Sequence, residues 1–290
     1  MRYMSLRLCF LLLTFTYVVQ AESNEDAPDP HKMMVNYFQA QFDTALTQRK
    51  EHYETLKTTE QLTAYQEERR ATFKELLGPF PERTPLNPQV IDTLQRDGYT
   101  IEKIIYESRP NYFVTALMYL PEAKGPHPGV LIPCGHGHDG KAFEPYQRVG
   151  IMLAKNGIAA LCYDPVGQGE RHMFLNDDNT PRFSTTLSHT LFGVPAILLG
   201  TNIATYRIWD GIRGLDYLES RPDIDPKRLG CTGNSGGGTL TSYIMALDDR
   251  VQVAVPNCYI TSFEELLPSI GPQDAEQNIF GQVAFGLDHP

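Results

Sequence analysis

The stretch that decides the fold is Arg228-Leu-Gly-Cys-Thr-Gly-Asn-Ser-Gly-Gly-Gly-Thr-Leu-Thr-Ser-Tyr-Ile-Met-Ala-Leu247. Its first part, residues 229–232, is a short apolar run that predicts a buried strand. Its last part has apolar side chains at helical spacing, namely Leu240, Tyr243, Ile244 and Leu247. Between the two parts, Gly233-Asn-Ser-Gly-Gly237 matches the pattern Gly-x-Ser-x-Gly. The stretch therefore predicts a strand, a tight glycine turn and a helix.

The turn makes Ser235 a candidate catalytic nucleophile. In a unit of this kind the serine lies on a strained turn, and small flanking residues let the strand and the helix pack closely. The first turn of the helix offers free N–H groups and the positive end of the helix dipole to a developing oxyanion, beginning with the N–H of Gly236. A glycine-rich turn that binds a phosphate, or binds nothing, is the alternative.

Strands and helices alternate around this stretch. The predicted strands are residues 129–133, 158–163, 229–232 and 251–255, and the predicted helices are residues 146–156, 202–220 and 236–247. Such alternation implies an α/β fold with a mostly parallel sheet that helices cover on both faces. Residues 164 to about 200 are expected to form a long loop.

Two segments precede the alternating region. Residues 31–77 contain no Pro or Gly and have apolar stripes at helical spacing, so they predict two or three helices, followed by a proline-rich linker to residue 88. Residues 99–106 and 112–120 are rich in Ile, Val and Tyr and predict an antiparallel hairpin. We therefore divide this part of the chain into a helical segment with its linker, residues 31–88, and an α/β domain, residues 89–290.

The N-terminus has the pattern of a signal peptide, residues 1–21. Arg2 and Arg7 precede an apolar run, and small residues before Ala21 allow cleavage. The run is short for a membrane span, which makes an uncleaved anchor the lesser alternative. Residues 22–30 read as a flexible acidic leader. The expected product is secreted or periplasmic, without a membrane partner after cleavage.

Composition argues against several classes of partner. The chain has 25 Lys and Arg against 35 Asp and Glu, a net charge of −10, and no basic run, which argues against a nucleic-acid partner. The four cysteines beyond the signal peptide lie in or at the end of predicted strands and are expected to be small core residues rather than disulfides. No Cys or His spacing suggests a zinc site, so neither a metal nor another cofactor is expected.

Two more loops follow predicted strands at the same edge of the sheet, where open parallel sheets place their sites. In Cys134-Gly-His-Gly-His138 the glycines let the backbone aim an N–H inward, and the N–H of Gly137 or His138 is the candidate second oxyanion donor. A plain glycine turn with two surface histidines is the alternative. The loop of residues 164–172 is interpreted as structural, with Asp164 accepting from backbone groups at the turn rather than serving as a catalytic acid.

These motifs resemble those of α/β-hydrolases, and among them the acetyl xylan esterase and cephalosporin-C deacetylase group with its dienelactone-hydrolase-like relatives. The resemblance covers about residues 99–270. Members of the group commonly have Tyr where this chain has His138, and often Gln where it has Gly236. The residues that carry it are Cys134-Gly-His-Gly, Asp164-Pro-Val-Gly-Gln-Gly, Arg221-Pro-Asp-Ile-Asp-Pro-Lys-Arg-Leu-Gly-Cys-Thr-Gly-Asn-Ser-Gly-Gly-Gly and Val251-Gln-Val-Ala-Val-Pro.

The resemblance implies an ester hydrolase that uses no metal. Ser235 would attack a carbonyl, a histidine would take its proton, an acid would orient that histidine, and water would release the acyl group. The implied substrate is a small ester or an acetylated sugar or polysaccharide. The alternatives are a prolyl-oligopeptidase-like peptidase, although the residues before Tyr99 are too few for its β-propeller, and a non-catalytic binding module. The oligomeric state is not predictable.

The histidine and the acid are the parts that the sequence does not supply. In this fold they follow the serine in the order acid, then histidine, but residues 261–290 contain no clear strand. Asp288 and His289 are adjacent and read as the start of a loop. The histidines before the serine are expected in polar surface or loop positions; they are His136, His138, His172 and His189. We therefore expect both groups beyond Pro290, in a longer esterase whose last strands are missing here and whose sheet edge is open.

Overall fold

The structure is a computed structural model that describes residues 29–269, 271 and 274–287. The predicted signal peptide, most of the acidic leader, and Asp288 with His289 lie outside the described residues. The chain divides into two units, residues 1–38 and 39–290. In the first unit the described residues contain the start of helix α1 (Met33–Thr55). Everything that follows concerns the second unit.

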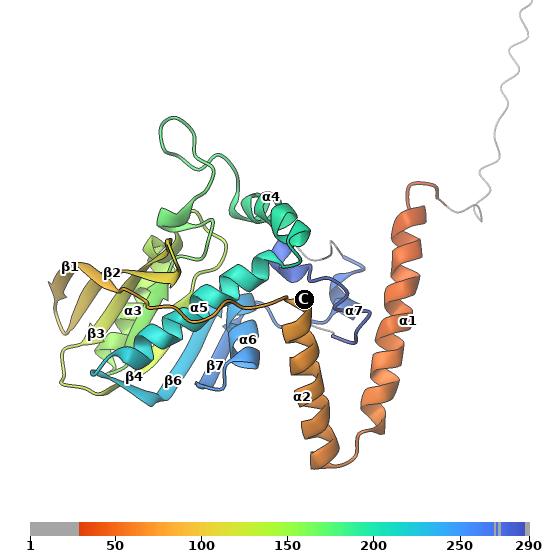
Figure 1. Cartoon of the computed structure of the whole chain (residues 1–290), viewed down its shortest axis with the longest axis horizontal. Helices are drawn as coiled ribbons and strands as arrows, with labels where there is room; N and C mark the ends of the chain where they lie inside the picture. Colours follow the sequence, from red (N-terminus) through yellow and green to blue (C-terminus); the bar gives the residue numbers. More distant parts are fainter. Residues whose placement is uncertain (1–28, 270, 272–273, 288–290) are drawn as a thin grey trace, which may run out of the picture. The chain divides into compact units, whose positions relative to one another are not determined.

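A mixed sheet forms the centre of this unit, and its described strands run in the order β1-β2-β3-β5-β4-β6-β7 (Figure 1). The neighbours among β5, β4, β6 and β7 are parallel, whereas β1, β2 and β3 are antiparallel to one another and β3 is antiparallel to β5. The α/β fold and its N-terminal hairpin are thereby confirmed; β1 is an additional strand that the sequence did not predict. The bounds are β1 (Gln89–Arg96), β2 (Tyr99–Arg109), β3 (Tyr112–Pro121), β4 (His127–Pro133), β5 (Ala159–Tyr163), β6 (Ile224–Asn234) and β7 (Val251–Asn257).

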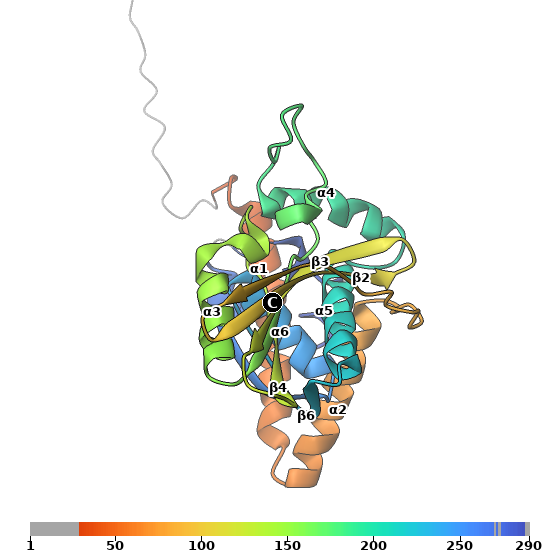
Figure 2. The same cartoon turned by 90° about the vertical axis from the view of Figure 1, so that its left-hand side faces the viewer.

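Helices lie on both faces of the sheet (Figure 2). Helices α5 (Ile203–Ser220) and α6 (Gly236–Leu247) contact the sheet on one side, and α3 (Glu144–Lys155) packs against β3 and β5 on the other. Alternate residues of β4 enter different cores, with Leu131 in the larger cluster and Ile132 in the cluster that includes residues of α3. Burial on both faces explains why the central strands read as continuous apolar runs.

The prediction of a long loop after residue 164 is wrong in part, because residues 185–198 form helix α4 (Thr185–Leu198). Ser184 caps the helix by accepting the N–H of Leu187 at 3.2 Å. Gly193 and Pro195 lie inside the helix and disguise it in the sequence, since both residues normally predict a break. The helix is stabilised by contacts with a short 3-10 helix in the C-terminal segment, η3 (Ala275–Gln277), and such contacts are invisible in a linear pattern.

The segment before the sheet is helical, as predicted, but the linker that follows it packs against the α/β domain. Helix α2 (Thr59–Leu76) begins with a capping box formed by Thr58 and Gln61. In the predicted linker, Phe80 stacks on Trp209 of α5, with ring centroids 5.7 Å apart. The short elements not yet mentioned are η1 (Gly140–Ala142), η2 (Gly169–Arg171) and α7 (Phe263–Leu266).

Three of the four predicted core cysteines are buried, namely Cys134, Cys162 and Cys231, and all four are free thiols. Cys258 is exposed and was wrongly assigned to the core. It directly follows the last residue of β7 and has a φ of 52°, so its side chain has already left the sheet. Among the described residues no single helix is long and apolar enough to cross a membrane. Helices α4 and α5 together have the length and apolar composition of a membrane span, but a bend of 100° separates them.

Candidate active site

Ser235 lies at the junction of β6 and α6 in a strained conformation. Its φ of 56° and ψ of −121° place a residue with a side chain in a region that such residues rarely adopt. The turn is held by the N–H of Ser235, which donates to Asn257 O at 2.9 Å, and by the carbonyl of Ser235, which accepts from the N–H of Thr239 at 2.9 Å. The serine itself is exposed. These features confirm the predicted strand-turn-helix geometry.

Glycines let three backbone segments approach one another around the serine. A Cβ added to Gly233 would lie 2.6 Å from the carbonyl carbon of Gly237 and 2.7 Å from Pro133 O. A Cβ added to Gly237 would lie 3.0 Å from the backbone nitrogen of Gly135. Only glycine fits such approaches. The loop after β4 therefore lies directly against the turn that carries Ser235.

The side chain that this loop brings to the turn is that of His136. A Cβ added to Gly236 would lie 2.7 Å from Nδ1 of His136 and closer still to Cε1, so the imidazole fills the space beside Gly236. The ring also faces two carboxylates, with Nε2 lying 2.9 Å from Asp274 Oδ2 and 3.2 Å from Glu276 Oε1. Both are ion-pair distances, and neither pair is aligned as a hydrogen bond. The side chain is 17% exposed.

Behind His136 lies a buried network of charged and polar groups. Asp274 Oδ2 is 2.7 Å from His189 Nδ1. Arg207 donates from Nε to Glu276 Oε2 at 2.6 Å and approaches His189 Nε2 at 2.6 Å with Nη1. A guanidinium can only donate, so we assign Nε2 of His189 as the acceptor and Nδ1 as the nitrogen that donates to Asp274, although Val166 O also lies 2.9 Å from Nε2.

The charges in this network balance. Burial, and then the nearby Arg207 charge, lowers the pKa of His189, so this ring is neutral. Burial also disfavours a charged His136, but the contacts with Asp274 and Glu276 outweigh it and raise the pKa of His136 to about 9. Burial opposes ionisation of Asp274 as well, yet the two histidines hold its pKa well below the usual range. At neutral pH two cations, Arg207 and His136, face two carboxylates.

Three of these residues also offer ligand atoms of the kind that bind a metal ion. His136, His189 and Asp274 each offer a ligand atom, and these atoms lie within 4.8 Å of one another. Imidazole and carboxylate ligands suit zinc. However, the guanidinium of Arg207 already bonds Nε2 of His189, and the carboxylate charges are balanced without a further cation. The arrangement fits an ion-pair network better than a metal centre.

Gly137 and His138, the two other predicted site residues, lie in the same loop as His136 but contact the loop that follows β5. Gly137 O accepts from the side-chain amide of Gln168 at 3.4 Å. His138 O accepts from the N–H of Gly169 at 2.9 Å, and the His138 ring lies 5.4 Å from the ring of His172. These contacts leave the oxyanion role of the Gly137 or His138 N–H, like that of the Gly236 N–H, a prediction.

The structural reading of Asp164 is confirmed. The carboxylate is fully buried and accepts from the N–H of Lys141 at 2.7 Å and from the N–H of Glu170 at 3.2 Å. It also forms a very short ion pair with the ammonium of Lys141. Through these bonds Asp164 connects the loop after β5 with η1. The loop that contains His136 lies directly before η1 in the chain.

The surface or loop position expected for His189 is wrong, whereas His136 does lie in a loop, although not on the surface. His189 is fully buried on α4, and His136 is mostly buried against the turn that carries Ser235. Asp274 and Glu276 were not predicted as site residues, because they lie in a tail without a periodic pattern. One signal was available: Arg207 lies between apolar side chains in the predicted helix of residues 202–220, and a buried arginine requires carboxylates.

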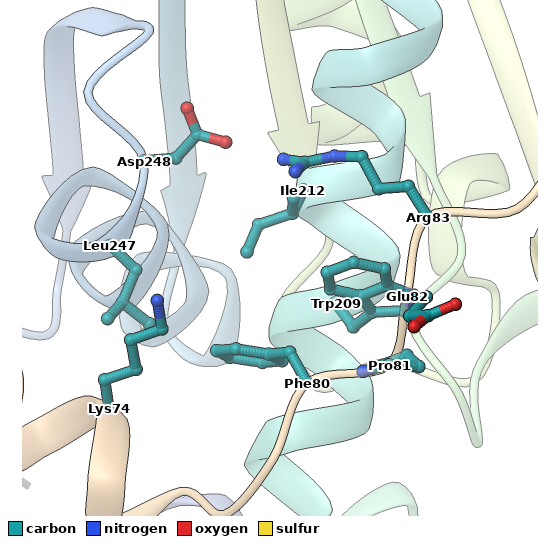
Figure 3. A pocket seen from close by; sticks show the side chains of 9 residues that line it. All are labelled: Lys74, Phe80, Pro81, Glu82, Arg83, Trp209, Ile212, Leu247 and Asp248. Atoms are coloured by element: carbon teal, nitrogen blue, oxygen red, sulfur yellow. The ribbon is translucent and has the colours of Figure 1, made fainter.

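A pocket lies near the other end of α6 (Figure 3). Ser235 precedes the first residue of α6, whereas this pocket includes Leu247, the last residue, so about 18 Å of helix separates them. Trp209 in its wall is buried and donates its Nε1–H to Ser108 O at 2.7 Å. The pocket is therefore separate from the candidate active site. The residues that line it are Lys74, Phe80, Pro81, Glu82, Arg83, Trp209, Ile212, Leu247 and Asp248.

The mixed sheet, the strained serine between β6 and α6, and the glycine loop that packs on it define the chain as an α/β-hydrolase in fold. The sequence model of the acetyl xylan esterase (AXE1) family matches residues 39–275, well over half of the chain. The chain belongs to this family, which confirms the resemblance found in the sequence.

Several known proteins are similar to this chain in sequence or in structure. The chain is 28% identical over 206 residues to the "Putative hydrolase YtaP" of Bacillus subtilis (strain 168), a match that covers 66% of this chain and 63% of that protein. The structure of a "putative acetyl xylan esterase" (BF1801) from Bacteroides fragilis NCTC 9343 is similar with a TM-score of 0.62 and 19% identity, covering 79% of this chain and 64% of that one. "Methylesterase BT1017" is similar with a TM-score of 0.64 and 24% identity, covering 86% and 54%. These structures show the fold, and the chain spans less than two thirds of each relative.

Proposed function

We propose that the chain carries the nucleophile of a serine carboxylic ester hydrolase and that Ser235 becomes acylated. The observation that carries the proposal is the strained, exposed Ser235 at the N-terminus of α6. Its hydroxyl would attack the ester carbonyl and form a tetrahedral intermediate. The N–H of Gly236 and the N–H of Gly137 or His138 would donate to the oxyanion. A general base would take the hydroxyl proton of Ser235 and pass it to the leaving alcohol as the ester C–O bond breaks, and water would then hydrolyse the acyl-enzyme.

The substrate class that we favour is an acetylated sugar or polysaccharide. Membership of the acetyl xylan esterase family supports it. A proton acceptor for Ser235 is not assigned, since within the described residues no histidine nitrogen hydrogen-bonds its hydroxyl. Export through the N-terminal signal sequence, which would bring the protein to extracellular polysaccharide, belongs to the same proposal.

The test is covalent labelling of the complete protein with a fluorophosphonate, followed by mass spectrometry of the labelled peptide, with hydrolysis of p-nitrophenyl acetate measured in parallel. Ser235→Ala is the test variant. Ser242→Ala is the matched control, because Ser242 lies on the same helix and its hydroxyl donates to Gly238 O at 3.0 Å. We expect the unaltered chain and the control to be labelled at Ser235, and the Ser235→Ala variant to be unlabelled. Labelling elsewhere, or equal labelling of Ser235→Ala, would overturn the proposal.

A further inference from the structure

The imidazole of His136 lies directly beside the residue that follows the candidate nucleophile. The space that a Cβ on Gly236 would occupy is taken by the ring, 2.7 Å from each of its nitrogens. Gly236 begins α6 and supplies the first free N–H of that helix. A charge on this ring would therefore lie next to the place where an oxyanion would develop.

Groups from three elements face the ring and determine its charge. From η3, Asp274 and Glu276 approach Nε2 at 2.9 Å and 3.2 Å. From α4, the neutral ring of His189 lies 5.4 Å away between ring centroids. From α5, Arg207 opposes a positive charge on His136, but its guanidinium is bound to the far oxygen of Glu276 at 2.6 Å. The two carboxylates are the nearest charges, so the ring is held as an imidazolium.

We propose that His136 is a positioning residue of this ester hydrolase, an imidazolium that Asp274 and Glu276 clamp beside Gly236 so that a fixed positive charge adds to the N-terminal dipole of α6 at the oxyanion site. This inference rests on the proposed function. A charge that is already oriented before the reaction stabilises a developing anion without reorganisation. The clamp also explains why glycine follows the serine, since any side chain at position 236 would displace the ring.

The role has a pH signature that a merely structural role does not have. The pKa of His136, raised to about 9 by its two carboxylates against the effect of burial, keeps the ring charged at neutral pH. The neighbouring ring of His189 stays neutral between pH 7 and pH 10, because burial and the nearby Arg207 charge lower its pKa. Acylation of Ser235 should therefore slow as the pH rises through about 9.

The experiment measures the rate of fluorophosphonate labelling of Ser235 in the full chain from pH 6 to pH 10.5. His136→Gln is the test variant, and His52→Gln on the exposed part of α1 is the matched control. We expect the control to behave as the unaltered chain, with a rate that falls above about pH 9. We expect His136→Gln to be about 10- to 100-fold slower at pH 7, comparable with or smaller than the loss of one oxyanion donor, and to lack the fall at high pH.

A second measurement does not depend on how well a variant folds. The titration of the His136 ring in the unaltered chain is followed by nuclear magnetic resonance, and a midpoint near pH 9 is expected. A midpoint near 6.5, or a folded His136→Gln that keeps the high-pH fall, would overturn the inference while the proposed function stands. Failure of Ser235 to be labelled at any pH would overturn the proposed function, and the role of His136 with it.

Discussion

Replacement of Gly236 by alanine tests the position of His136 most directly. The new Cβ would lie 2.7 Å from both ring nitrogens and closer still to Cε1, whereas unstrained contacts between such atoms are about 3.5–4.0 Å. The overlap is therefore about 1 Å. The ring has little freedom to yield, because Nε2 lies between Asp274 and Glu276, and Glu276 is bound to Arg207. Overpacking of this kind costs about 1–3 kcal/mol, and we expect Gly236→Ala to lower the free energy of unfolding by that amount.

A double-mutant cycle isolates the contact. The free energy of unfolding in urea is measured for the unaltered chain, Gly236→Ala, His136→Ala and the double variant. In the His136→Ala background the ring is absent, so Gly236→Ala should cost less than about 0.5 kcal/mol. Gly238→Ala is the control, because its Cβ would lie 2.5 Å from Asn257 O and 2.8 Å from the Cβ of Tyr259, neither of which involves His136.

The outcome that would refute the reasoning is a cost for Gly236→Ala that is the same, within about 0.5 kcal/mol, with and without His136. The imidazole would then not occupy the space beside Gly236, and the clamp would be wrong. For the control Gly238→Ala, in contrast to the result expected for Gly236→Ala, the cost should be the same with and without His136. A change in both costs would indicate that His136→Ala rearranges the whole turn.

Two further predictions concern the network behind His136. The pKa of His136 is raised from 6.5 to about 9 in the folded chain, so its stabilising contribution is complete below about pH 6.5 and is lost as the pH rises through 9. Urea unfolding at pH 6.5 and pH 9.5 should differ by up to about 3 kcal/mol, and a difference that persists in His136→Gln would contradict the assignment. Arg207→Met should cost about 3–5 kcal/mol in the same assay, because it removes the guanidinium that is bound to the buried carboxylate of Glu276. Arg70→Met, at the exposed pair with Asp249, should cost less than about 1 kcal/mol, and equal costs would refute the argument.

Much of the fold could be predicted because local patterns and the tertiary structure agree. The strands from 129 to 255 and the helices between them follow from apolar periodicity and from glycine and proline at their ends. The prediction failed at α4, where Gly193 and Pro195 hide a helix, and at β1, whose residues are mostly exposed and show no buried face. Helix α4 depends on η3, which lies far along the chain, whereas β1 is held by pairing with the neighbouring strand β2.

The residues of the candidate site also fall into those that local sequence patterns predict and those that they do not. Ser235 is recognisable because its role requires a local unit, a strand, a turn and a helix, and small residues around the turn are visible in the sequence. The same holds for Asp164, whose turn geometry is local. The roles of Ser235 and Asp164 could therefore be predicted without knowing which distant segments of the chain contact each other.

By itself, therefore, the sequence determined the sheet apart from β1, the turn that carries Ser235 and the glycine loop that follows β4. Only the tertiary structure decided that His136 lies beside Gly236 and that Asp274 and Glu276 clamp it. The reason is physical. A turn is specified by the conformational preferences of neighbouring residues, whereas an ion-pair network among residues up to 140 positions apart arises only when folding removes their charges from water and each must find a partner.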